Sequence, residues 1–179
     1  YKIETIVRNC GTQILQAKNE KMNIEKKEGI GNIVTEYDKK IQKELKEKLL
    51  KKGYSFYSST DTEVAIKLVD YYYKKYEHTP VDAINHAMVR IRGSYAFAFI
   101  FKDYPDEIFV ARKDSPMIVG KNDKGCFIAS DVPAILKYTR TVYYVDNQEV
   151  VELKKEGMCF YSIDEEKLVK EPVTVEWDV

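Results

Sequence analysis

The stretch that most restricts the fold of this chain is SYAFAFIF, residues 94–101, which is apolar at almost every position. A strand with one face in water alternates apolar and polar residues, whereas a strand covered on both faces does not. The run is therefore predicted to be a strand buried on both faces. The segment KDYPDE is predicted to be a turn, after which EIFVAR, residues 107–112, returns antiparallel.

More short strand patterns follow this hairpin toward the C-terminus. They are separated by Asp, Asn, Gly and Pro turn residues and read SPMIVG, CFIAS, TVYYV, EVVEL, MCFYSI and VTVEW. One short helix, DVPAILKYT, is predicted between them. Helices that cover a sheet with two apolar faces imply layers rather than a closed barrel. The predicted fold class is α+β, a layered sandwich of antiparallel sheets and helices.

The first part of the chain has helical periodicity instead. Apolar residues recur at helical spacing over residues 3–17, and the glycine-rich stretch 29–32 then interrupts the pattern as a loop. A second helix restarts at Thr35 and should end at a cap formed by Gly53. After a short strand pattern, YSFYS, two more helices are predicted. Their N-caps are Thr60 and Thr79.

The charge balance excludes several classes of function. Lys and Arg number 29, and Asp and Glu number 29, so no net charge draws the chain to nucleic acid or to an anionic membrane. No apolar run approaches the roughly 18 residues of a membrane span. Three cysteines without a CxxC pair favour reduced thiols in the cytoplasm over a disulfide framework. We therefore expect a cytoplasmic protein with no cofactor and no nucleic-acid or membrane partner.

Five motifs from Gly53 onward resemble a known family. The motifs are GYSFYSSTDTEV, RIRGSYAFAFIF, IFVARKDSPMIVG, CFIASDVPAILKYT and VEWDV. Their order and spacing resemble those of the glutaminase domain of glutamine–fructose-6-phosphate aminotransferases, which are class II glutamine amidotransferases. The resemblance covers about residues 45–179. It implies the N-terminal-nucleophile hydrolase fold, here incomplete at its N-terminal side and preceded by a helical segment. It also implies glutamine hydrolysis that supplies ammonia for glucosamine 6-phosphate synthesis.

The same resemblance assigns a ligand to Asp61. In the family, the aspartate of the TDTEV motif binds the α-amino group of glutamine, and Asp61 occupies that position here. The physical chemistry agrees, because Thr60 and Glu63 can form a capping box and leave Asp61 free at the first helical position. A carboxylate pairs well with an ammonium group, and helix N-termini favour negative charge. The alternative is that Asp61 only complements the helix dipole.

The residues that perform the family's chemistry are not found in this sequence. The resemblance implies a nucleophilic cysteine at the first position of the mature chain, where this sequence has Tyr1. Cys10 lies on the apolar face of a helical pattern, and Cys126 and Cys159 lie in strand patterns, so all three are predicted to be buried structural thiols. The HTRWATHG-like loop and the Asn-Gly oxyanion turn do not occur either. We therefore predict no catalytic residue, an inactive chain, and glutamine binding that is weak or lost.

The first 42 residues resemble a different family. IVRNCGTQILQAKNEKMNIEKKEGIGNIVTEYDKKIQ is similar to the opening of magnesium-dependent sugar phosphatases of the inositol monophosphatase type. This resemblance places Lys27 near that family's active-site loop, with Thr35 and Asp38 supporting it. The later GEE and DPIDGT-like motifs that hold Mg²⁺ do not occur, and one aspartate cannot make such a site, so no metal is predicted. The simpler interpretation is that Thr35 and Asp38 cap a helix.

Two domains and three functions follow as hypotheses. The domains are a helical segment, residues 1–42, and a truncated glutaminase domain, residues 43–179, joined within a helix that both families have. The favoured function is a glutaminase domain without activity. The alternatives are a fragment of a magnesium-dependent phosphatase and a non-catalytic assembly module that forms homodimers through exposed sheet edges. Whether the composite is natural, an assembly error or an engineered fusion stays open.

Overall fold

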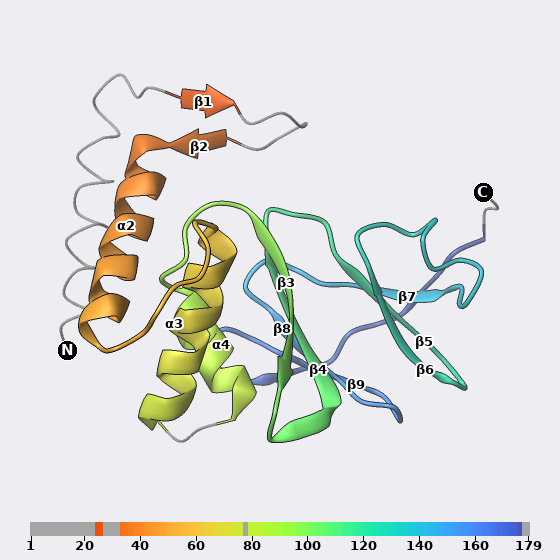
Figure 1. Ribbon diagram of the computed structural model, residues 1–179. Helices are drawn as coiled ribbons and strands as arrows, with labels where there is room; N and C mark the ends of the chain where they lie inside the picture. Colours follow the sequence, from red (N-terminus) through yellow and green to blue (C-terminus); the bar gives the residue numbers. More distant parts are fainter. Residues whose placement is uncertain (1–23, 27–32, 77–78, 177–179) are drawn as a thin grey trace. The chain divides into compact units, whose positions relative to one another are not determined.

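The computed structural model of the chain describes residues 24–26, 33–76 and 79–176, with side chains from residue 39 onward. These residues form two compact units (Figure 1). One comprises residues up to Tyr76 together with His86–Gly93, and the other comprises Glu77–Asn85 together with Ser94–Val179. Within the described part of the chain, no helix has the length and apolarity needed to cross a membrane.

The first unit contains a two-stranded sheet followed by a helix. β1 (Ile24–Lys26) pairs antiparallel with β2 (Ile33–Thr35), and α2 (Glu36–Lys51) begins directly after β2. The sequence does not predict these two strands, because strands of three residues are too short to show an alternating pattern. The predicted loop over residues 29–32 lies outside the described residues and stays a prediction. The helix follows its prediction, since its buried apolar face consists of Ile41, Leu45 and Leu49. The helix predicted over residues 3–17, with Cys10, lies outside the described residues.

Gly53 ends α2 as predicted. Its φ of 88° lies in the left-handed region, which glycine adopts without a steric penalty. The Gly53 amide donates to the Leu50 carbonyl at 3.0 Å and the Tyr54 amide donates to the Leu49 carbonyl at 3.1 Å, so the last carbonyls of the helix are satisfied. The strand predicted for YSFYS is wrong, because residues 54–60 form a loop. A strand needs a neighbour for its backbone groups, and no described strand pairs with this loop.

Two further helices begin where the sequence predicts them. α3 (Asp61–Tyr76) starts directly after Thr60, and α4 (Pro80–Met88) starts directly after Thr79. Each helix has an acidic residue in its first turn, where the backbone amides favour negative charge. The apolar positions of α3 are buried as its spacing predicts, namely Val64, Ala65, Leu68, Val69 and Tyr72.

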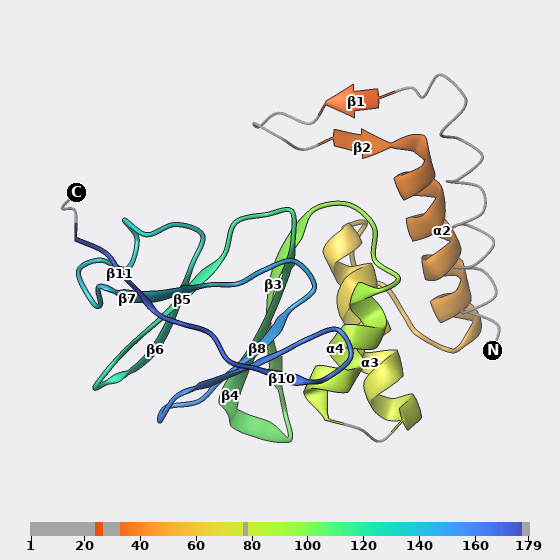
Figure 2. The same cartoon turned by 180° about the vertical axis from the view of Figure 1, so that it is seen from behind.

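The second unit is a sandwich of two antiparallel sheets (Figures 1 and 2). The larger sheet has the strand order β10-β9-β8-β4-β3, and the smaller has the order β11-β7-β5-β6. The strands are β3 (Tyr95–Phe101), β4 (Tyr104–Lys113), β5 (Ile118–Asn122), β6 (Gly125–Ala129), β7 (Thr141–Tyr144), β8 (Val150–Leu153), β9 (Met158–Tyr161), β10 (Lys167–Leu168) and β11 (Val173–Thr174). The predicted open layers are therefore confirmed.

One apolar core lies between the two sheets. The larger sheet contributes residues of β4, β8 and β9, and the smaller sheet contributes β5 and its flanking segments. The buried members are Val110, Met117, Val119, Val145, Val151, Leu153 and Phe160. This core fixes the two sheets face to face, which is the arrangement of a sandwich.

The second face of the smaller sheet is covered by residues 131–139. The sequence predicts a helix there, but the structure has successive turns. The Ile135 amide donates to the Val132 carbonyl at 3.1 Å, and the Tyr138 amide donates to the Ile135 carbonyl at 2.8 Å. Pro133 contributes no amide hydrogen, and so short a segment gains few helical bonds to offset nucleation. The helix prediction is therefore wrong, although Val132 and Ile135 of this segment are buried.

β3 is buried on one face only, contrary to the prediction for residues 94–101. Phe99 is buried, whereas Ala96 and Ala98 are exposed and Ile100 is 74% exposed. β3 is the last strand of its sheet, and the core between the sheets draws on β4, β8 and β9 instead. The smaller sheet does not extend over β3, and alanine loses little by facing water. Homodimer formation through this open edge stays a prediction.

Candidate functional site

Asp61, the predicted glutamine contact, is the first residue of α3 and is exposed. Among the residues that the structure describes, none forms a hydrogen bond or an ion pair with its carboxylate. The loop of residues 57–60 and the first turn of α3 present this carboxylate to the surroundings. An unpaired carboxylate at an exposed helix start is available to a cationic group of a ligand.

Glu63 holds the loop before Asp61 in place. Its carboxylate accepts the backbone amides of Tyr57 at 2.9 Å and Ser58 at 2.7 Å, and it accepts the Ser58 hydroxyl at 2.7 Å. The predicted capping box would join Glu63 to the Thr60 amide, but that amide donates to the Ser58 hydroxyl oxygen at 3.2 Å. Glu63 therefore reaches further back along the chain, and Ser58 is the functional partner that the sequence pattern missed.

Helix α2 supports the same loop from within the first unit. The Lys46 ammonium donates to the Ser58 carbonyl at 3.3 Å and lies 4.8 Å from the centre of the Phe56 ring. Lys67 of α3 lies 5.6 Å from the centre of the Tyr57 ring. Cations over aromatic rings stabilise exposed contacts of this kind by about 0.5–1 kcal/mol. The loop is thus attached to both helices, which fixes the direction of the first turn of α3.

Replacing Glu63 by Gln is expected to loosen the loop that carries Asp61. The hydrogen bond from the Tyr57 amide is the main cause that lowers the pKa of Glu63, so the charge is present at neutral pH. Glutamine keeps the size but loses the charge that strengthens these bonds. Hydrogen exchange at the amides of Tyr57 and Ser58 should become severalfold faster at neutral pH.

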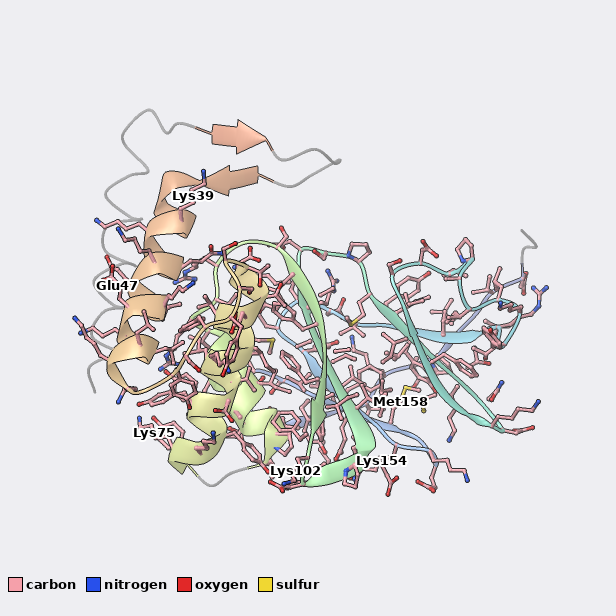
Figure 3. The ribbon with its side chains drawn as sticks, in the orientation of Figure 1. Lys39, Glu47, Lys75, Lys102, Lys154 and Met158 are labelled. Atoms are coloured by element: carbon pink, nitrogen blue, oxygen red, sulfur yellow. The ribbon has the colours of Figure 1, made fainter. Side chains whose placement is uncertain are left out.

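The pH dependence and a control complete this test. A carboxyl group whose pKa is lower in the folded state than in the unfolded state stabilises the folded state at pH values above its unfolded pKa. This stabilisation is lost as the pH falls through the folded pKa. The difference between wild type and Glu63→Gln should therefore disappear in acid. Glu47→Gln, on the exposed face of α2 (Figure 3), should leave these amides unchanged. Equal exchange in wild type and Glu63→Gln at neutral pH would contradict the assignment.

The two described cysteines are not placed as nucleophiles. Cys126 lies in β6 and Cys159 lies in β9, and both are free and half-buried rather than fully buried as predicted. The Cys126 thiol donates to the Lys154 carbonyl at 3.2 Å, and burial raises the pKa of this thiol. A reactive thiol needs the opposite, a lowered pKa. Cys126 therefore acts as a packing residue at the edge of the apolar core.

The phosphatase-like positions gain no geometric support from the described part of the chain. Lys27 lies outside the described residues. Thr35 ends β2, directly before α2, and Asp38 lies in the first turn of α2, which are the places that a helix cap requires. Among the described residues, no group of His, Cys, Asp and Glu could hold a metal ion. Their roles in a phosphatase stay predictions.

A family profile described as the glutamine amidotransferase domain matches residues 27–137. The match covers more than half of the sequence, so this chain belongs to the glutamine amidotransferase domain family. The match begins within residues 1–42, so the phosphatase resemblance of that segment and the domain boundary after residue 42 stay predictions.

Curated relatives of this chain include glutamine–fructose-6-phosphate aminotransferases. The glutamine–fructose-6-phosphate aminotransferase (isomerizing) of Clostridium acetobutylicum is 49% identical over 130 residues, which are 73% of this chain and 21% of that protein. The enzyme of the same name from Thermococcus kodakarensis is 42% identical over 130 residues, again 73% of this chain and 21% of that protein. The chain spans about a fifth of the length of the relatives it matches.

Solved structures share the fold. Glutamine phosphoribosylpyrophosphate amidotransferase from Bacillus subtilis, complexed with ADP and GMP, has a TM-score of 0.57 and 27% identity over 68% of this chain and 26% of that chain. A structure described as the allosteric regulatory enzyme of purine biosynthesis has a TM-score of 0.53 and 26% identity, with the same coverage of both chains. The fold is therefore of the N-terminal-nucleophile hydrolase class, with helices and antiparallel sheets.

Proposed function

We propose that this chain provides a glutamine-binding scaffold of the glutaminase type, in which Asp61 holds the α-ammonium group of glutamine. The observation that carries the proposal is the exposed carboxylate at the first position of α3, on a loop that Glu63 fixes. A salt link between a carboxylate and an ammonium group is among the stronger hydrogen bonds in proteins. A rigid loop also limits the entropy that is lost when the ligand binds.

We further propose that no thiol of this chain attacks the glutamine amide. Cys126 and Cys159 lie in paired strands of the second unit, and burial raises the pKa of Cys126. Nucleophilic attack on an amide requires an activated thiolate beside a proton acceptor. The scaffold therefore binds glutamine without turning it over. Within a longer protein, the scaffold would hold the glutamine that donates its amino group to fructose 6-phosphate, the reaction for which its relatives are named.

The test compares glutamine with an analogue that lacks only the amino group, 4-carbamoylbutanoate. Wild type should bind glutamine more tightly, by roughly tenfold to a hundredfold, because a hydrogen bond to a charged group contributes about 1.5–3 kcal/mol. The isosteric Asp61→Asn variant should lose most of this preference and leave the affinity for the analogue unchanged. Binding is measured by calorimetry or by chemical-shift titration.

The Glu47→Gln variant is the matched control, since it removes one exposed carboxylate from α2 that forms none of the loop contacts described above. It should keep the wild-type preference for glutamine. If Asp61→Asn discriminates between the two ligands as well as wild type does, or if wild type does not distinguish them, Asp61 does not hold the ammonium group and the proposal fails.

A further inference from the structure

A cavity of about 550 Å³ lies within the second unit, and Asp61 is not among the residues that line it. It forms where three loop segments meet: the connection from β4 to β5, the residues after β6 and the residues after β7. Small-molecule sites have volumes of about 300–1,000 Å³ and combine apolar walls with a few polar groups. The walls are mainly apolar and include Pro116, Met117, Ile118, Val132 and Pro133.

Arg112 places a positive charge in the wall of this cavity. Its Nε donates to the Val145 carbonyl at 2.5 Å, and its Nη1 donates to the Ser115 carbonyl at 3.2 Å. Both partners are neutral, and none of the described residues forms an ion pair with this guanidinium. The two hydrogen bonds fix the orientation of the Arg112 guanidinium without cancelling its charge. A half-buried guanidinium in this state favours a carboxylate ligand, which can accept two parallel N–H bonds.

Two carboxylates stand at the rim of the cavity. Asp114 has a φ of 57°, and a reciprocal pair of bonds holds it there. Its amide donates to Asn147 Oδ1 at 2.8 Å, and Asn147 Nδ2 donates to Asp114 Oδ1 at 2.9 Å. In the segment after β6, Asp131 Oδ1 accepts the Ala134 amide at 3.2 Å. Each carboxylate therefore has a fixed direction, and each is exposed on a charged rim.

We propose that this cavity binds a free α-amino acid with an aliphatic side chain. The carboxylate of the ligand pairs with Arg112, and its ammonium group lies between Asp114 and Asp131. The aliphatic side chain contacts Met117 and Val132, which are buried in the wall. One cation, two anions and an apolar surface match a zwitterion with an apolar side chain better than they match a phosphate, which the two aspartates would repel.

The experiment titrates the full chain with L-leucine and follows backbone chemical shifts. Leucine should cause saturable shifts at residues that line the cavity. Leucinamide lacks the carboxylate, 4-methylpentanoate lacks the ammonium group, and glutamine replaces the aliphatic side chain with a polar one. Each should bind about tenfold or more weakly than leucine, because each leaves one charged or apolar group of the site without its partner.

Variants test the assigned contacts one at a time. Asp131→Asn keeps the oxygen that accepts the Ala134 amide and removes the charge, so it should weaken leucine but not 4-methylpentanoate. Arg112→Lys should weaken leucine and leave leucinamide unchanged. Asp123→Asn, in the turn between β5 and β6, is the matched control and should bind leucine as wild type does. If Arg112→Lys does not fold, the ligand series and the Asp131→Asn variant still test whether the cavity binds the amino acid as proposed.

Several results would overturn the proposal. Leucinamide that binds as tightly as leucine would show that Arg112 does not hold the carboxylate. Unchanged leucine affinity in Asp131→Asn, or no saturable shift at the cavity, would exclude the site. Loss of leucine binding in Asp61→Asn would place the ligand at the start of α3 instead, so failure here is distinct from failure of the glutamine assignment.

Discussion

The polypeptide of residues 1–179 is expected to release ammonia from glutamine about a million-fold more slowly than an intact glutaminase, because loss of an enzyme nucleophile has an effect of that order. Its two described thiols lie in strands, and burial raises the pKa of the Cys126 thiol, which disfavours the reactive thiolate. An amide carbon is a poor electrophile, so neither water nor a neutral thiol attacks it at a useful rate.

The measurement is coupled detection of ammonia with glutamine in excess. The aminotransferase of Clostridium acetobutylicum, which is 49% identical to this chain over the shared part, serves as the active reference under the same conditions. Three single variants, Cys10→Ser, Cys126→Ser and Cys159→Ser, should leave the residual rate unchanged. A rate within about a hundredfold of the reference, abolished by one of these substitutions, would identify a nucleophile and refute the prediction.

The sequence predicts those parts of the fold that depend on local signals. Gly53 ends α2 because a left-handed residue is needed there, and glycine is the residue that adopts this conformation most easily. α3 and α4 begin directly after Thr60 and Thr79, and threonine is among the residues that favour the N-cap position. Turn residues between apolar runs placed most strands of the two sheets. None of these features needs information from a distant part of the chain.

The errors concern features that depend on distant partners. The exposure of Ile100 follows from how far the smaller sheet extends, which β3 itself does not encode. The strand expected at residues 54–60 has no described strand to pair with. Three-residue strands such as β1 are fixed by their partner rather than by their own pattern.

The same distinction applies to the candidate site. Asp61 could be placed at a helix start from the threonine before it and the acidic residue after it. The actual partners of Glu63 could not be predicted, because two hydroxyls and three amides within six residues compete for one carboxylate. The cavity around Arg112 escaped the sequence analysis for a different reason, since it draws on three segments that are separated by strands.

Phe109→Ala is expected to lower the free energy of unfolding of the second unit by about 3–5 kcal/mol. Phe109 is 1% exposed, and its ring makes edge contacts with Phe101 at 5.5 Å and Tyr104 at 6.0 Å between ring centres. Truncation removes the buried ring and leaves a cavity at the centre of the β3–β4 hairpin. The backbone there is held by ladders to β3 and β8 and cannot collapse to fill it.

The control is Ile100→Ala on the neighbouring strand, where the side chain is 74% exposed and a change of no more than about 0.5 kcal/mol is expected. Urea unfolding followed by circular dichroism gives both changes in the free energy of unfolding, provided that the slope of this free energy against urea concentration is the same in the variants and in wild type. A large effect at Ile100 would mean that the outward face of β3 is covered in solution, as by pairing with a second copy. A loss of less than about 1 kcal/mol at Phe109 would mean that the larger sheet does not pack around this ring as described.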